Sequence, residues 1–433
     1  MSVFDPKESF EVKADELDCS LADGGNLQTA VIRGRGDLPA TVRLDTLTVT
    51  GAEVRARIPD QWAEVPGPGR MLLQSYKDLD GRTVPEPVPV AITWTQSMRY
   101  QGRENFAIFT GDVHAASEST TTFDCAELRA EFDDVVKTAK DAPARRLGVL
   151  QPIVDSVVGD GDEPRGELSR RTSAKQIASI YATGHAVAQT STFDSATGEM
   201  KSRARLEGPK LSVNLRDEVS KMLIEGAGNL QLEDFLASDA PRTVRAPARG
   251  DLFAGSDDNG PSKTLVQWKG RMWYDFAVDQ VRFEEGVDLK HLSGQELERV
   301  FGVSPGAEPA RQPGRRTFVT SNVLTVDFLG RSSRARTNEE RRMGSLSSDR
   351  IRQFRAFGDV LLQDQTEGLW LNADDVVFER DRSLLTIVGS KSRKAQLVKQ
   401  QPGKLPTQLS MDRLFYNLAT GEPEIVGPVV RGQ

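Results

Sequence analysis

The sequence predicts an all-β protein, an elongated antiparallel sheet built from repeated strand units with short helical insertions. Three observations lead to this prediction. One stretch near the C-terminus alternates apolar and polar residues in the manner of strands, the same pattern recurs along the chain, and a longer block of aromatic and apolar residues occurs twice. Units of this kind bury their apolar faces only by stacking on one another.

The stretch from 357 to 389 shows the strand pattern most clearly. Its middle strand has apolar or small residues at Leu369, Leu371, Ala373, Val376 and Phe378. A period of two is typical of a half-buried strand. The step from Ala373 to Val376 is three residues, so we expect a bulge or a bend at Asp374 and Asp375 to keep both halves facing the same side.

Related units recur at 10–21, 42–49, 123–132, 204–215, 319–328 and 409–418. A second element marked by glycine accompanies several of them, at Gly36, Gly111, Gly286 and Gly358. The longer repeat has a constant offset of 174 residues. It relates Trp94, Met98, Tyr100, Phe109 and Val113 to Trp268, Met272, Tyr274, Phe283 and Val287.

Taken in order, the chain is expected to form a β segment over 1–134, a linker or insertion over 135–178, and a second β segment over 179–290. A helix and loop insertion over 291–316 and a C-terminal β segment over 317–433 follow. Residues 63–90 are rich in proline and glycine and are expected to connect strands. Ser293, with Glu296 three residues later, predicts the start of a short helix through Phe301.

The composition limits the class of protein. Only 38% of residues are hydrophobic and 6% aromatic, which suits a thin interior better than a large globular core. A net charge of −7 argues against a nucleic-acid partner, since phosphate binding needs a basic face. No apolar run reaches the length of a membrane-spanning helix. No secretory signal is visible, so the chain is expected to be cytosolic, or else a mature chain or a fragment.

The residues that could carry chemistry are few. His114, His185 and His291 are scattered without metal-ligand spacing, so no metal site is expected. The Asp374–Asp375 pair is a poor acid and base pair because neighbouring strand residues face opposite sides. No nucleophile motif or cofactor motif is present, and we expect neither an enzyme nor a cofactor. Cys19 and Cys125 are expected to be small buried residues, with a disulfide left open.

A continuous apolar seam remains, and it is the candidate site. It is either a closed core or the lining of a V-shaped trough, open along one edge, that would hold acyl chains. The lining residues would be Phe10, Val12, Leu17, Phe123, Leu128, Phe132, Leu206, Leu211, Val213, Leu324, Val326, Phe328, Leu371, Val376, Phe378, Leu414 and Tyr416.

Three segments resemble the OstA/LptA family: 109–134, 357–389 and 410–428. The shared rhythm is a Gly-Asp-Val strand, a turn, an Ala-Asp-x-Leu-x-Tyr/Phe strand and a strand that ends in glycine; residues 10–21 repeat the Ala-Asp-x-Leu phrase. The resemblance implies a twisted β-jellyroll or "β-taco" that binds the acyl chains of lipopolysaccharide in the periplasm. It also implies end-to-end stacking, with itself or with other envelope transport proteins, and no catalytic residue or cofactor.

The sequence therefore predicts a periplasmic lipid-binding scaffold that carries lipopolysaccharide or another large lipid towards the outer membrane. The alternative is a structural or interaction β-solenoid of the cell envelope that binds no ligand. A polysaccharide-acting enzyme is disfavoured, because such sites need clustered carboxylates and aromatic residues on one face.

Overall fold

The computed structural model describes residues 2–5, 10–22, 27–36, 38–44, 47–77, 79, 83–117, 121–136, 173–194, 197–216, 221–235, 262–293, 316–328, 351–401 and 403–426. Within them, all 28 strands belong to one sheet and every strand pair is antiparallel, so the all-β prediction is confirmed. The helical structure in these ranges is a single 3-10 turn, Arg380–Arg382. No helix in the described residues is long and apolar enough to cross a membrane.

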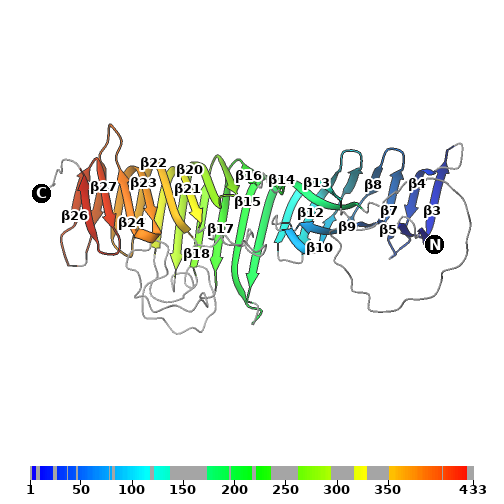
Figure 1. The fold of residues 1–433 in the computed structure, drawn as a ribbon, viewed down its shortest axis with the longest axis horizontal. Helices are drawn as coiled ribbons and strands as arrows, with labels where there is room; N and C mark the ends of the chain where they lie inside the picture. The colour runs from blue at the N-terminus through cyan, green and yellow to red at the C-terminus, as the bar shows by residue number, and fades with distance from the viewer. Residues whose placement is uncertain are drawn as a thin grey trace, which may run out of the picture.

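The sheet is long and folded lengthwise into two walls, with its first and last strands at opposite ends (Figure 1). Strands that lie in one wall are paired in the order β1, β2, β5, β6, β9, β10 and, farther along, β17, β18 and β25, β26. We call this wall A. Its strands are β1 (Ser2–Asp5), β2 (Phe10–Lys13), β5 (Ala40–Leu44), β6 (Leu47–Gly51), β9 (Gly69–Lys77), β10 (Thr83–Trp94), β17 (Gly228–Asp234), β18 (Ser262–Trp268), β25 (Ala395–Lys399) and β26 (Thr407–Met411).

Wall B faces wall A and is built in the same way. Its strands are β3 (Glu16–Leu21), β4 (Leu27–Arg33), β7 (Glu53–Arg57), β8 (Trp62–Pro66), β11 (Ser97–Gln101), β16 (Lys221–Glu225), β19 (Arg271–Asp275), β24 (Leu384–Val388), β27 (Arg413–Asn417) and β28 (Glu422–Val426).

Eight longer strands run through both walls and hold them together. They are β12 (Phe106–Ser117), β13 (Thr121–Val136), β14 (Ser173–Phe193), β15 (Met200–Asn214), β20 (Gln280–Ser293), β21 (Arg316–Phe328), β22 (Ile351–Asp364) and β23 (Leu369–Glu379). Each passes from one wall to the other at its middle. We call the line along which the chain passes between the walls the corner, and the opposite, open edge the mouth.

At the corner, every second long strand has two consecutive residues whose backbone adopts the left-handed conformation. The pairs are Gly111–Asp112, Gly184–His185, Glu285–Gly286 and Gly358–Asp359, with φ between 39° and 81°. Each pair faces one residue of the next strand, namely Ala126, Pro209, Asn322 and Asp374. Two residues opposite one form a bulge, which bends the sheet. Glycine adopts this conformation at little steric cost, which explains the recurrent glycine.

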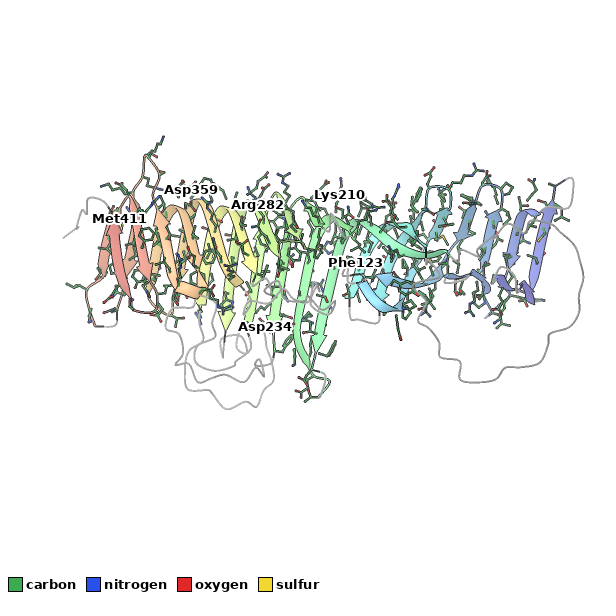
Figure 2. All side chains as sticks on the ribbon, viewed as in Figure 1. Phe123, Lys210, Asp234, Arg282, Asp359 and Met411 are labelled. Carbon is green, nitrogen blue, oxygen red and sulfur yellow. The ribbon has the colours of Figure 1, made fainter. Side chains whose placement is uncertain are left out.

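The expected bend near Asp374 is confirmed, and the structure assigns the extra residue. Phe357 pairs with Asp375 and Val360 pairs with Ala373, so the surplus residue lies in β22, at Gly358–Asp359, while β23 supplies Asp374 alone. Figure 2 shows Asp359 and Lys210, which follows Pro209, along the same long edge of the molecule.

Residues 63–90 form β8, β9 and most of β10, so the expected connection is wrong. Gly67 and Gly69 lie at the corner, where Gly67 has a φ of 87°. The prolines at 85, 87 and 89 lie in the part of β10 that precedes its pairing with β12, which begins at Val90. Pro85 and Pro87 fall in the irregularity between Thr83 and Val88, where the β9 ladder is interrupted, and Pro89 pairs with Gln74 of β9. A missing N–H is tolerated at such positions.

The three expected β segments share one ladder of strands. β13 pairs with β14 on either side of the expected linker, and β20 pairs with β21 on either side of the expected helical insertion. The strands extend into these insertions, to Val136, from Ser173, to Ser293 and from Arg316. The expected helix after Ser293 lies outside the described residues, as do 137–172, 236–261, 294–315 and 329–350.

Candidate functional site

The space between the walls holds one apolar cluster that runs from Val12 to Tyr416. Fifteen of the predicted lining residues are buried in it: Val12, Phe123, Leu128, Phe132, Leu206, Leu211, Val213, Leu324, Val326, Phe328, Leu371, Val376, Phe378, Leu414 and Tyr416. Leu17 is partly buried against the cluster, and the side chain of Phe10 lies outside the described residues. The structure therefore brings these residues together, and their contact with a ligand stays a prediction.

The interior is filled by its own side chains. Val376, Phe378 and Leu414 have no exposed surface. The walls are joined along the corner by continuous strands, whereas no described strand of wall A pairs with one of wall B across the mouth. Separating the walls at the mouth would therefore break apolar contacts without breaking a strand ladder between them.

The 174-residue repeat corresponds to a structural unit at the corner. Trp94 Nε1 donates a 3.0 Å hydrogen bond to the carbonyl oxygen of Gly67, and its ring centroid lies 5.2 Å from that of Phe109. Trp268 Nε1 donates to Gly226 at 3.1 Å, and its ring lies 5.1 Å from Phe283. Both indoles are buried, so each N–H needs such a partner.

The mouth has a polar border on wall A, which the sequence analysis missed. Its members face inward at the ends of adjacent strands: Thr190, Thr192, Ser202, Asp234, Ser262, Thr264, His291, Thr317 and Asp364. Thr192 and Ser202 hydroxyls lie 2.6 Å apart, Ser262 donates to Asp234 at 3.1 Å, and Thr264 Oγ1 lies 2.8 Å from His291 Nδ1. The sequence signal that could have predicted this border is the presence of serine and threonine at inward-facing positions near strand ends.

The border of wall B is aromatic and apolar. Tyr100 and Phe132 lie with ring centroids 6.4 Å apart, and Tyr274 and Phe328 lie 6.5 Å apart. Leu215 is buried between these two pairs along the wall. The mouth thus has hydrogen-bonding groups on one side and rings on the other.

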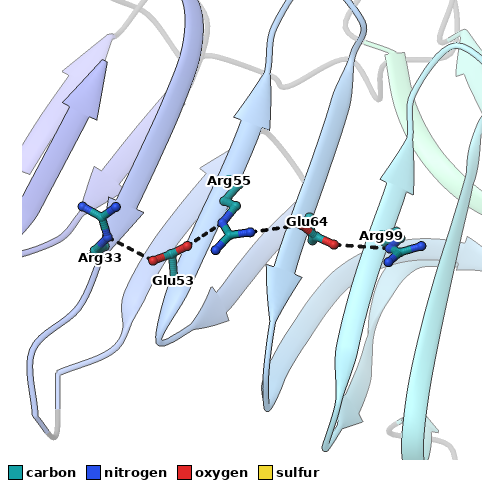
Figure 3. A network of polar contacts seen from close by, with 5 residues as sticks. All are labelled: Arg33, Glu53, Arg55, Glu64 and Arg99. Carbon is teal, nitrogen blue, oxygen red and sulfur yellow. Dashed lines mark hydrogen bonds and ion pairs between the residues drawn. The ribbon is translucent and has the colours of Figure 1, made fainter. Parts of the chain in front are cut away.

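Alternating charges cross the outer face of wall B. Figure 3 shows Arg33, Glu53, Arg55, Glu64 and Arg99 in one line over β4, β7, β8 and β11. The pKa of Glu53 lies below its usual value because of the hydrogen bond from Arg55 and that from Arg33. Cross-strand pairs of opposite charge stabilise neighbouring strands modestly.

A more buried carboxylate with cationic partners lies on the outer face of wall A. Glu233 accepts hydrogen bonds from Arg203 Nε at 2.7 Å and from Gln231 at 2.7 Å, and Lys263 Nζ lies 2.8 Å away. Burial raises the pKa of Glu233, but the bonds from Lys263 and Arg203 outweigh it and hold the pKa below its usual value. The arrangement holds strands together and leaves Glu233 ionised.

The histidines and the aspartate pair lie apart from one another. His114 contacts Asp124 at 2.7 Å on the outer face, His185 lies at the corner, and His291 belongs to the polar border. Asp375 is bound by Arg355 through two hydrogen bonds, of 3.0 and 2.5 Å. In the part of the chain that the structure describes, no three His, Cys, Asp or Glu side chains are grouped to hold a metal ion.

Both cysteines are free thiols. Cys125 is buried as expected, and burial raises the pKa of its thiol to about 12, with Asp124 and Glu127 adding to the shift. Cys19 is exposed, so its expected burial is wrong. It lies on β3, whose one ladder is with β4, and the outermost strand of a wall has less of the interior to cover it.

No family model matches the chain, and no curated protein matches it. Part of the chain is similar in structure to LptH, described as the LptA-homologous periplasmic component of the lipopolysaccharide transport device of Pseudomonas aeruginosa. The match has 16% identity and a TM-score of 0.23, and it covers 36% of this chain and 97% of LptH.

Proposed function

We propose that this chain is a lipid-binding scaffold that holds acyl chains between its two walls and carries no catalytic residues. The observation that supports this proposal best is the apolar interior, which is continuous from Val12 to Tyr416. At its mouth, none of the described strands of one wall pairs with a strand of the other. An acyl chain that enters replaces contacts between walls with contacts to lipid. The polar border of wall A would then face the head group.

The energetics allow this exchange. Burying one methylene contributes about 0.8 kcal/mol, so a chain of about twelve methylenes contributes on the order of 10 kcal/mol before the cost of parting the walls. Because opposing side chains are apolar on both sides, the cost is lost packing rather than unsatisfied polar groups.

Lipopolysaccharide, or another large lipid, is the proposed ligand, and the periplasm is the proposed location. The support for both is the OstA/LptA rhythm of 109–134, 357–389 and 410–428, together with a trough that could hold several acyl chains along its length. The role is then passage of lipid towards the outer membrane.

The proposed partners are further copies of the chain, or other envelope transport proteins, which would pair with the end strands. Among the described strands, β1 pairs with β2 alone and β3 with β4 alone at one end, while β26 and β28 each have one partner at the other end. Unpaired strand edges accept further strands unless they are protected. Light scattering over a concentration series tests self-association directly.

The second candidate is a structural β-solenoid that binds no ligand. The observation that favours it is the tight filling of the interior, where Leu324, Val376 and Phe378 have no exposed surface. A core of this kind needs no ligand to be stable.

Val326→Asp separates the two candidates. It places a carboxylate on the inner face of β21, and co-purifying lipid should be lost while the strand signal in circular dichroism remains. The matched control is Thr325→Asp, the neighbouring position, which faces outward and pairs with Arg282 and Arg355. Equal lipid content in both variants and the wild type would contradict the proposal.

A further inference from the structure

One two-stranded segment leaves wall B and reaches towards wall A. β12 begins at Phe106, which pairs with Glu131, so residues 132–136 of β13 extend beyond it. β15 ends at Asn214, which pairs with Ser179, so residues 173–177 of β14 extend beyond it as well. These two extensions pair with each other alone, and we call them the crossing ribbon.

The crossing ribbon ends against β9, a strand of wall A. β14 contacts β9 although the two strands are not paired. At the wall A side, Ser75 and Leu79 are buried; at the ribbon side, Phe132 and Ile177 are buried. The ribbon starts at a bulge, where Phe132 pairs with Ile177 and Ala178 is the surplus residue. A bulge re-aims the strands that follow it, so the ribbon bridges the mouth at this point.

The base of the crossing ribbon is fastened by Arg216. Its Nε and Nη2 donate to the two carboxylate oxygens of Asp133 at 3.2 and 3.1 Å, and its Nη1 donates to Ser179 Oγ at 3.1 Å. Asp133 belongs to the ribbon, and Ser179 lies in wall B, two residues after the ribbon part of β14 ends. Two backbone bonds assist: Phe132 N to Asn105 O and Leu215 N to Ala178 O, both 2.8 Å. A two-stranded ribbon has little stability by itself, so these fastenings hold its position.

We propose that the crossing ribbon is a strap that excludes large polar head groups from the stretch of mouth between β9 and β14. This inference rests on the proposed function. In the same strands, β12 and β13, the side chains of Phe109, Phe123 and Leu128 are buried and make the interior apolar. A polar head group that enters this interior would lose its hydrogen bonds to water. It must therefore stay at the mouth, which the strap covers at this point. Acyl chains can lie beneath the strap, while a bulky head group passes only when the strap lifts.

Two tyrosines at corresponding positions of the 174-residue repeat provide the test. Both lie on the aromatic border of wall B; Tyr100 is partly buried beside Phe132 of the strap, whereas Tyr274 is buried. Each is replaced in turn by the photo-crosslinker p-benzoylphenylalanine in the full chain. Purified lipopolysaccharide is the probe, because it combines acyl chains with a large saccharide head.

We expect few crosslinks from position 100 in the otherwise unsubstituted chain and at least fivefold more in an Arg216→Ala background. Position 274 is the reference away from the strap: Tyr274 is buried between Phe276 and Phe328, and its yield should not depend on Arg216. Arg205→Ala is the control background, since Arg205 lies on β15 and binds Glu207 at 2.6 Å, away from the strap. A yield at position 100 that Arg216→Ala leaves unchanged would overturn the strap but not the lipid-binding interior. No crosslink at either position in any background would overturn the proposed function itself.

Hydrogen exchange tests the fastening without any lipid. Arg216→Ala should raise the exchange rate of amides 132–136 and 173–177 about tenfold and leave that of amides at the corner, such as 124–128, unchanged. Arg205→Ala should change neither. Unchanged exchange in the ribbon of Arg216→Ala would overturn the role given to Arg216.

Discussion

Trp268 donates its indole N–H to the carbonyl oxygen of Gly226, and its ring lies over Gly228 two residues later. Trp94, Gly67 and Gly69 form the same arrangement at the earlier copy of the repeat. The Gly-x-Gly at 226–228 therefore serves the corner: one glycine supplies a left-handed turn, with a φ of 91°, and the other leaves room for the ring.

Gly228→Ala should destabilise the fold by about 2 to 3 kcal/mol, as overpacking of a filled interior does. A Cβ at this position would lie 2.5 Å from Trp268 Cζ2 and closer still to the carbonyl oxygen of Glu207. Neither neighbour can move without disturbing the corner. The midpoint of urea unfolding measures the change.

The control for this substitution is Gly198→Ala. Gly198 has a φ of 72°, but a Cβ there would meet no atom within 4 Å. Its cost is that of the left-handed backbone alone, about 1 kcal/mol. If Gly228→Ala were no more harmful than Gly198→Ala, the packing account of the corner would be wrong.

Glu233 should make the fold sensitive to acid. Its pKa in the folded chain lies below the ordinary value of 4.5, because the bonds from Lys263 and Arg203 outweigh burial. A group with a lowered folded pKa binds its proton more readily in the unfolded chain. Its stabilising contribution is therefore complete above pH 4.5 and is lost as the pH falls through the folded pKa.

Glu233→Gln should cost about 2 kcal/mol at pH 7, the range for hydrogen bonds to charged groups. The difference from the wild type should shrink as the pH falls below 4.5. Glu225→Gln is the control, since Glu225 is exposed and its nearest cation, Lys210 Nζ, is 3.9 Å away. Denaturant unfolding at pH 7 and pH 3 decides; a difference that stays constant with pH would refute the assignment.

The two cysteines should react at different rates. In the folded protein at pH 8, a thiol reagent should modify Cys19, which is exposed, and leave Cys125, whose pKa is raised to about 12. Cys125 should react after denaturation. Cys19→Ser should remove the fast reaction and Cys125→Ser should leave it intact. Two fast thiols, or none, would show that the interior near β13 is not closed as described.

Alternation with a period of two predicted much of this fold because each wall has one face exposed to solvent and one face buried in the interior. Val376 and Phe378 in β23, and Leu324 and Val326 in β21, point inward as the pattern indicates. The three-residue step between the inward residues Ala373 and Val376 also located the corner. At a bulge, inward residues of the strand opposite the surplus residue are three apart instead of two.

Other features could not be predicted from the pattern. The prolines of β10 suggested a connection, because the sequence does not tell how many neighbours each half of a strand has. Cys19 lies at an apolar position of the alternating pattern of residues 10–21, yet it is exposed, because β3 lies at the end of its wall. The polar border was missed because its members are distant in sequence and only strand register places Ser262 opposite Asp234 and His291 opposite Thr264.

The lipid scaffold is tested by native mass spectrometry of the full chain purified from a Gram-negative envelope, followed by lipid extraction. A lipid scaffold should carry a bound lipid of defined mass with several acyl chains, present in the wild type and in Thr325→Asp and absent from Val326→Asp. A lipid-free mass for the wild type, unchanged after addition of lipopolysaccharide, would contradict the lipid scaffold and favour a closed structural solenoid.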